Sequence, residues 1–389
     1  MAKIVTLCKP FLLILSFVFA RVVCALDYTE EMFNKTTPKG MLTITEPVQQ
    51  LHRTLIIADL HADPLLWARD LRVRSQTGHL DIPRLLEGNV GLQVFSAVTQ
   101  VPFRMKMQNN PSDSDQLPAL MMAQAWPAGT WFNVHKRALH QAEKLHALQQ
   151  SSPEQFRIIK SRSDLQTYLT DRQRNPKQTA GLLALEGVQP LEGSLAKFRL
   201  LRDAGYRMMG LAHFFDNEAA GSAHGEKRGG LTEFGRQLVV AMQENGVIVD
   251  LAHASAQTIE DVMARVKKPV VVSHTGVDGV CPSVRNLSDA QLRSITATGG
   301  VIGIGFWPEA ICDISPAGIA KAIRYTVGIV GIEHVALGSD FSGAVTTAIH
   351  AGQLQQVTQA LVNAGFTEEE IRLIMGENTV RVLMATLPE

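Results

Sequence analysis

The sequence predicts an α/β protein in which one large domain forms an eight-stranded parallel barrel. Eight short apolar runs are bounded by turn residues, a pattern typical of strands buried on both faces of a parallel sheet. Helical stretches alternate with these runs, as crossover connections require. Four histidines and three carboxylates follow the ends of six of the runs. Because the carboxyl ends of barrel strands meet at one edge, these seven side chains predict a metal site there.

The helix boundaries support this order of elements. Ser288 and Thr367 each begin a capping box, which Gln291 and Glu370 complete three positions later. Glycines stand where helices are expected to end before the chain turns back, at Gly205, Gly246, Gly299 and Gly365. The strands themselves are expected at residues 55–59, 90–97, 181–185, 208–212, 247–251, 270–273, 301–306 and 335–338. Eight such units close more naturally into a barrel than into an open sheet.

One segment exceeds what a minimal barrel needs. Between residue 99 and about residue 150 the chain carries four prolines, a polar run at 109–116 and a helical run at 135–148. This insertion follows the second strand, so it emerges at the same edge as the candidate metal ligands. Insertions at that edge often wall a substrate pocket, and we expect this one to do so.

The amino terminus has the order of an export signal. Lys3 and Lys9 precede an apolar stretch at residues 11–20, and small residues around Ala25 offer a cleavage point. The stretch of about ten residues is shorter than the roughly 20 that a spanning helix needs. We therefore predict a signal peptide over residues 1–25, with an uncleaved membrane anchor as the alternative, and one metal-dependent domain over residues 26–389. The protein would then be periplasmic or extracellular.

Composition limits the classes of binding partner and the number of disulfides that can form. Lys plus Arg and Asp plus Glu both number 37, so no global field would attract nucleic acid or another polyanion. A hydrophobic content of 46% provides the apolar material for a large core. If the signal is cleaved, only Cys281 and Cys312 remain of the four cysteines. One disulfide is then allowed, and none is required.

The first three candidate ligands lie at the ends of the first and third strands. His61 and Asp63 are two positions apart, so on an extended chain both side chains point to the same side and reach one ion. Glu186 follows a continuous apolar run, where burying a lone carboxylate is costly unless a cation or a donor meets it. A salt-bridged or capping role is the structural alternative for Glu186. Its two oxygens would also let it bridge two ions.

The remaining candidates follow four later strands. His213, His253 and His274 end the fourth, fifth and sixth strands, and Asp340 ends the eighth. Taken singly, a histidine at a strand end is more often a hydrogen-bonded structural group, and Asp340 could cap a helix. Taken together with the carboxylates, they predict a polar centre that holds metal and activates water. We therefore interpret the chain as a metal-dependent hydrolase.

Seven short motifs occur in a fixed order between residues 51 and 383. They are Asp59-x-His61-x-Asp63, Leu185-Glu186-Gly187, Asp250-Leu251-Ala252-His253-Ala254-Ser255, Ser273-His274, Arg285-Asn286, Gly338-Ser339-Asp340-Phe341 and Gly376-Glu377-Asn378. As a set they resemble the membrane dipeptidase family, also called renal dipeptidase. This sequence differs from many members of that family at Ala62, at Phe214 and the three residues after it, and at Trp307. These differences bear on substrate preference and leave the metal site intact.

The resemblance implies a TIM-type barrel that holds two zinc ions. Carried over by position, His61 and Asp63 would bind one ion, and His253 and His274 would bind the other. Glu186 would bridge the two ions and so belong to the catalytic residues. Every ligand position of the family is filled in this sequence.

The resemblance also implies roles around the ions. His213 would contact the reacting carbonyl of the substrate, and Asp340 would act as the acid/base. Arg285, next to Asn286, would bind the terminal carboxylate, which favours dipeptides over longer chains. By resemblance, the enzyme would tolerate a D-residue at the carboxyl side and would form a dimer.

Two other functions stay open at this point. One is a non-hydrolytic, metal-binding maturation factor on the same barrel, although no ligand or acid/base is lost here. The other is a related amidohydrolase that acts on N-acyl amino acids or cyclic amides, although the His-x-His opening usual in that superfamily is absent. We treat the remaining histidines as structural or exposed: His52, His79, His135, His140, His146, His224, His334 and His350.

Overall fold

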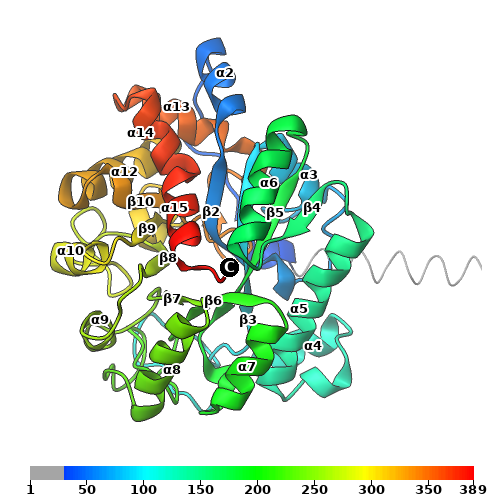
Figure 1. Cartoon of the computed structure of the whole chain (residues 1–389), viewed down its shortest axis with the longest axis vertical. Coiled ribbons are helices and arrows are strands. Elements are labelled where there is room, and N and C mark those ends of the chain that lie inside the picture. The colour runs from blue at the N-terminus through cyan, green and yellow to red at the C-terminus, as the bar shows by residue number, and fades with distance from the viewer. Residues whose placement is uncertain (1–29) are drawn as a thin grey trace, which may run out of the picture.

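The computed structural model of the chain describes residues 30–389, which form a closed barrel of parallel strands (Figure 1). Its eight strands are β2 (Ile57–Ala62), β3 (Val90–Val98), β5 (Thr179–Glu186), β6 (Tyr206–Gly210), β7 (Ile248–Asp250), β8 (Val271–Thr275), β9 (Val301–Ile304) and β10 (Val335–Leu337). Around the ring the order is β3-β2-β10-β9-β8-β7-β6-β5, and β5 pairs back with β3. The predicted fold class is confirmed.

All eight expected strands are present, and their bounds shift by a few residues. β2 runs on to Ala62, which forms a bridge with Phe341 after β10. His61 therefore lies within the strand. Three short strands were not predicted. β4 (Phe156–Ile158) pairs with the first residues of β5, and β1 (Lys35–Thr36) pairs with β11 (Thr346–Thr347). Two or three residues are too few to show an apolar period in the sequence.

Helices cover the outside of the ring, and their ends follow the expected chemistry (Figure 1). Both predicted capping boxes form, at Ser288 before α10 and at Thr367 before α14. All four predicted stop glycines have positive φ, which an L side chain rarely adopts. The helices are α2 (Glu46–Thr54), α3 (Ile82–Glu87), α4 (Leu117–Ala123), α5 (Val134–Ser151), α6 (Arg162–Arg174), α7 (Leu195–Asp203), α8 (Glu233–Glu244), α9 (Ala256–Met263), α10 (Asp289–Thr296), α11 (Pro308–Ile311), α12 (Pro316–Val330), α13 (Gln355–Asn363), α14 (Glu368–Arg372) and α15 (Asn378–Thr386).

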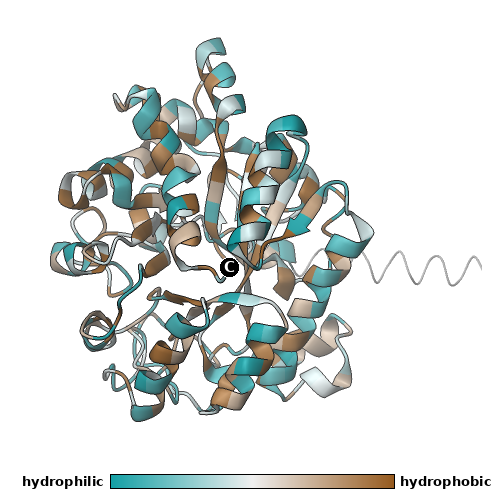
Figure 2. Cartoon of the chain, viewed as in Figure 1, coloured by the Kyte–Doolittle hydropathy of each residue, from teal (hydrophilic) through white to brown (hydrophobic). Residues whose placement is uncertain are grey.

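The barrel interior is a packed apolar core that supports the polar edge above it. Inward-facing residues such as Ala58, Val94 and Ile248 are fully buried and pack together. The end of the chain closes this core, since Leu383 and Leu387 belong to the same cluster. In Figure 1 the C-terminus accordingly lies at the centre of the ring, and Figure 2 shows the strands as largely hydrophobic. These packed side chains exclude water from the barrel interior on the side away from the carboxyl edge.

The insertion after the second strand is confirmed and occupies the chain between β3 and β4. It contains α4, a short 3-10 turn and the long helix α5. Lys144 of α5 is half-buried and donates hydrogen bonds to the backbone oxygens of Leu65 and Trp67, at 2.5 and 2.6 Å. Trp67 in turn packs with Leu117 of α4. The insertion is therefore fastened to the turn that follows β2.

The predicted signal peptide lies outside the described residues, so its cleavage or anchoring stays a prediction. Within residues 30–389, none of the helices combines the length and the apolar character needed to cross a bilayer. The boundary of the metal-dependent domain at residue 26 likewise stays a prediction.

Candidate metal centre

The structure brings all seven predicted side chains to the carboxyl edge of the barrel. Some lie on the strands themselves, and others lie in the first residues of the loops that follow. Every one of them is buried. Strand β2 and its loop carry His61 and Asp63, β5 carries Glu186, the loops after β6 and β7 carry His213 and His253, β8 carries His274, and the loop after β10 carries Asp340.

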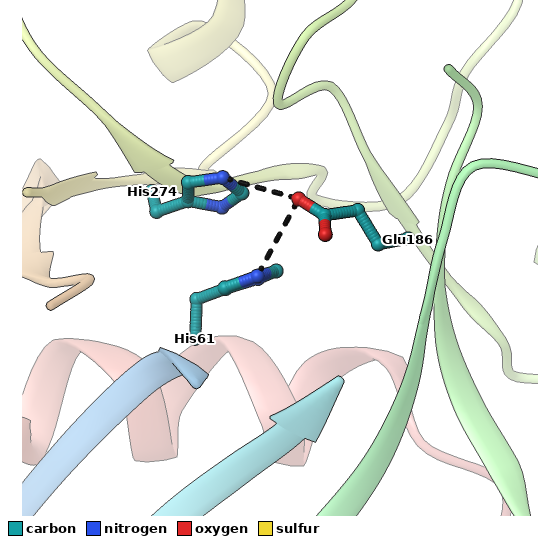
Figure 3. A group of neighbouring side chains, drawn as sticks. All are labelled: His61, Glu186 and His274. Carbon is teal, nitrogen blue, oxygen red and sulfur yellow. Dashed lines mark ion pairs between the residues drawn. The ribbon is translucent and has the colours of Figure 1, made fainter. Parts of the chain in front are cut away.

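Glu186 is the centre of this group. Its Oε1 lies 3.1 Å from Nε2 of His253, 3.3 Å from Nε2 of His274 and 3.5 Å from Nε2 of His61. Its Oε2 lies 3.4 Å from Nε2 of His213. Figure 3 shows two of these imidazoles, from different strands, converging on the same carboxylate oxygen. One buried carboxylate thus faces four imidazole nitrogens.

The donor atoms fit divalent cations. Three overlapping sets have ligand atoms within 4.8 Å of one another: His61 with Glu186 and His274, Glu186 with His213 and His253, and His61 with Asp63 and Asp340. Nε2 of His61 and Oδ1 of Asp63 are buried and lack a hydrogen-bond partner among the described residues. Such orphaned polar atoms are costly unless an ion meets them. Imidazole nitrogens with carboxylate oxygens are the donor set that zinc accepts.

The pKa values of these side chains in the protein without metal also indicate a site for positive charge. Burial alone lowers the pKa of His61, but the carboxylates of Asp63, Glu186 and Asp340 outweigh it and raise the pKa to about 10. Burial raises the pKa of Glu186 and of Asp340 well above the usual range, and Asp63 adds to both shifts. A proton on His61 therefore takes the place of positive charge that the carboxylates require. Burial lowers the pKa of His253.

Ser273 is a buried residue of the centre that the strand-end pattern did not single out. Its hydroxyl lies 3.2 Å from Nδ1 of His61 and 2.9 Å from Nδ1 of His274. If both Nδ1 atoms carry the ring proton, the hydroxyl oxygen accepts both hydrogen bonds and both Nε2 atoms are left with free lone pairs. Orientation of this kind tunes metal-binding histidines in proteins. Ser273 precedes His274 in the predicted motif, but its contact with His61 depends on the barrel register.

The backbone at the edge is bent to deliver these side chains. His253 and Asp340 both have a φ of 62°, the left-handed region that residues other than glycine rarely adopt. Gly343 makes room for the second of them, because a Cβ there would collide with Oδ1 of Asp340 and lie 2.9 Å from Oδ2 of Asp63. Strained conformations of this kind are typical of functional sites.

Arg285 lies beside the centre, in the loop after β8. It is buried, and Nη2 donates to the backbone oxygen of His274 at 2.6 Å. Its guanidinium carbon lies 5.6 Å from the ring of Trp307. Burial lowers its pKa to about 10, so it stays charged at neutral pH. Among residues 30–389, no carboxylate oxygen lies within 4.0 Å of its guanidinium nitrogens, the limit for an ion pair.

Asn286, predicted to bind substrate with Arg285, is engaged elsewhere. Its amide oxygen accepts from the backbone N–H of Gly276, and its amide nitrogen donates to the backbone oxygens of Cys281 and Ala310. The structure therefore uses Asn286 to hold the loop that carries Arg285. Cys281 also forms a disulfide with Cys312, which the sequence had left open.

A cavity of about 430 Å³ opens beside the centre. Asp63, Glu186, Arg285 and Asp340 line it, as does His224, for which the sequence predicts only a structural or exposed role. His224 is fully buried, and its Nδ1 lies 2.8 Å from the backbone oxygen of Met107. Its place in a long loop after β6 offered no strand-end signal in the sequence.

A parallel barrel with histidines and carboxylates gathered beside a cavity defines the class of metal-dependent hydrolases. Residues 45–387 match the membrane dipeptidase family, peptidase family M19. The chain therefore belongs to the membrane dipeptidase family and is a metallo-dipeptidase by class. This confirms the resemblance drawn from the seven motifs.

Individual relatives agree with this assignment. Dipeptidase aclJ of Aspergillus oryzae is 26% identical over 358 residues, which cover 87% of this chain and 79% of the relative. Dipeptidase tcpJ of Claviceps purpurea is 28% identical over 326 residues, covering 80% and 70%. A metallopeptidase from Rhodobacter sphaeroides, solved with a phosphinate mimic of L-Ala-D-Ala, is 25% identical with a TM-score of 0.70, covering 86% of this chain and 99% of its own. The probable dipeptidase PvdM from Pseudomonas aeruginosa shares the fold at 20% identity, with a TM-score of 0.72, covering 88% and 98%.

Proposed function

We propose that the enzyme is a dipeptidase that holds two zinc ions through Glu186. The observation that carries this proposal is that two donor sets share this carboxylate, one with His61 and His274 and the other with His213 and His253. Following the family resemblance, His61 and Asp63 would hold one ion, and His253 and His274 would hold the other. Mixed imidazole and carboxylate donors match the ligand preference of zinc.

The residues around the ions have distinct tasks in this proposal. When bound, the ions activate water and polarise the scissile carbonyl. Burial lowers the pKa of His213 to about 3, so its ring is neutral and donates a hydrogen bond to the carbonyl oxygen as charge develops there. Asp340 lines the cavity, and burial raises its pKa, which suits a group that takes a proton and delivers it to the leaving amine.

The substrate is proposed to be a dipeptide with a free carboxyl end. Arg285 supports this, because a buried guanidinium without a carboxylate partner is costly unless a ligand supplies one. The relative from Rhodobacter sphaeroides was solved with a mimic of L-Ala-D-Ala. With that ligand as support, we propose that this chain accepts a D-residue at the carboxyl side.

The experiment is a zinc determination on the purified protein, followed by hydrolysis assays with L,L and L,D dipeptides. We expect close to two ions per chain and hydrolysis that stops on chelation. Metal-loaded protein that hydrolyses no dipeptide would favour the maturation-factor alternative. A preference for N-acyl amino acids or cyclic amides would favour the amidohydrolase alternative.

We also propose that the protein is exported and forms a homodimer. The Cys281–Cys312 disulfide supports export, because disulfides persist in oxidising compartments. The order of charged, apolar and small residues at the amino terminus supports the same route. Cell fractionation and analytical ultracentrifugation test the two statements separately. A cytoplasmic protein with free thiols would contradict the first, and a monomer at working concentrations would contradict the second.

A further inference from the structure

The cavity has two chemically different sides. Near the centre its wall consists mainly of the carboxylates, the imidazoles and Arg285, with Phe214 beside His213 and Trp307 beside Arg285. Away from the centre the wall is apolar, and its members come from the insertion, the turn after β2 and the first described residues. They include Phe33, Trp67, Met105, Met107, Leu117 and Leu120. A cavity of about 430 Å³ is in the range that holds drug-sized ligands, far more than a dipeptide of glycine or alanine fills.

The ring order places these two sides opposite each other. Starting from β8, which precedes Arg285, four steps in either direction around the ring of eight lead to β3. The insertion that supplies most of the apolar wall follows β3. If the substrate's carboxylate binds Arg285 and its amide lies at the centre around Glu186, the amino-terminal residue extends toward the apolar wall. The wall therefore faces the side chain of that residue.

The wall is preformed. His224 donates a hydrogen bond from Nδ1 to the backbone oxygen of Met107 at 2.8 Å, and the backbone oxygen of His224 accepts from the N–H of Asn110 at 3.0 Å. Trp67 donates from its indole nitrogen to the backbone oxygen of Ser342 at 2.7 Å, and Phe33 stacks on its ring with centroids 5.9 Å apart. These bonds hold apolar side chains at the cavity before any substrate arrives.

Part of this apolar surface is open to water. Met105 is 43% exposed and Met107 is 38% exposed, although both line the cavity. Exposed apolar patches beside a site mark places where a ligand is bound. Methionine suits such a wall because its flexible thioether adapts to different apolar shapes. A ligand side chain that covers the two methionines removes apolar surface from water.

We propose that the enzyme selects dipeptides whose amino-terminal residue carries a large apolar side chain, either branched aliphatic, thioether or aromatic. This inference rests on the proposed function, because it takes the position of the amide and the carboxylate from it. Loss of one methylene contact in an apolar pocket changes kcat/KM by roughly 10- to 200-fold. For a wall that is partly open to water, we expect the lower end of that range.

The first test uses the full-length, zinc-loaded protein and four dipeptides, of which Leu-Ala and Ala-Leu have the same composition in reversed order. We expect kcat/KM for Leu-Ala and Phe-Ala to exceed that for Gly-Ala by about tenfold or more. The reversed dipeptide Ala-Leu should not gain in this way, because its large side chain lies on the Arg285 side. Hydrolysis of all four with equal efficiency, or a preference for Gly-Ala or Ala-Leu, would overturn this inference alone. Failure to hydrolyse any of them would refute the proposed function and this inference with it.

The second test changes the wall. The double variant Met105→Ser, Met107→Ser should lower kcat/KM for Leu-Ala about tenfold more than for Gly-Ala. Met122→Ser is the matched control, because Met122 lies on the same insertion, is also 43% exposed and is not part of the cavity wall. Met122→Ser should leave kcat/KM unchanged for both substrates. Equal losses on both substrates in the double variant, with an unchanged melting temperature, would show that the methionines do not select the substrate.

A third measurement does not depend on turnover. Calorimetry with two non-hydrolysable phosphinate dipeptides, which differ only in a leucine or glycine side chain at the amino-terminal position, reports binding directly. The leucine analogue should bind about tenfold more tightly and with a more negative heat capacity change, the signature of apolar burial. Equal affinity for the two analogues would overturn the inference.

Discussion

Replacing Arg285 by methionine removes the only charged partner that we assign to the substrate's carboxylate. The side chain is buried and remains charged, and among residues 30–389 the carboxylates of Asp340 and Glu186 act on it only from beyond ion-pair distance, so a ligand carboxylate can pair with it directly. A hydrogen bond to a charged group contributes about 1.5–3 kcal/mol, which corresponds to roughly 10- to 150-fold in kcat/KM. We expect Arg285→Met to lower kcat/KM for Leu-Ala by roughly 10- to 150-fold and to lower it much less for amidated Leu-Ala.

The assay compares kcat/KM for the free and the amidated dipeptide in both proteins. Wild-type enzyme should prefer the free acid, and the variant should lose the preference. Because Arg285 also donates to the backbone oxygen of His274, zinc content must be measured in the variant. Arg285→Lys, which keeps the charge without the planar fork, should recover part of the preference. Equal losses on both substrates with full zinc content would refute the assignment.

Four further predictions concern the centre. Glu186→Ala should remove both ions and abolish hydrolysis, as metal analysis and assay would show; an active variant with full metal would contradict the shared-ligand role. Asp340→Asn should keep the zinc but lose about 10²-fold or more in kcat, whereas a loss below about tenfold would make it structural. Ser273→Ala should weaken zinc binding by about 10- to 100-fold in a chelator competition, with Ser283→Ala, in the loop after β8, as a control that leaves it unchanged. Because the pKa of His61 is about 10 without metal, its proton must leave when zinc binds at neutral pH, so zinc affinity should fall as the pH is lowered, by up to about tenfold per unit, with proton release in calorimetry.

Most of the centre could be predicted because topology fixes where parallel strands end. Once the apolar runs before His61, Glu186 and His274 are taken as parallel strands of one barrel, their final residues must lie at the same edge. No contact between distant residues needs to be known for that step. The two-residue spacing of His61 and Asp63 adds a local argument of the same kind.

What could not be predicted depends on the paths of loops. Asn286 stands next to Arg285 in the sequence, but the loop turns its amide toward backbone groups instead of the cavity. His224 reaches the cavity because its loop folds back against Met107, and no periodic pattern marks that contact. Ser273 acquires its role only when β8 and β2 bring two histidine rings to one hydroxyl.

The Cys281–Cys312 disulfide also acts on the unfolded chain. Its 31-residue span encloses the Arg285 loop, strand β9 and Trp307. Closing a loop of that length restricts the denatured ensemble and stabilises the folded state by about 3–4 kcal/mol. That is a large part of the roughly 5–15 kcal/mol that separates folded from unfolded states of ordinary domains. A chain produced where thiols stay reduced would thus populate unfolded forms far more often, and its yield would depend on the compartment in which it is made.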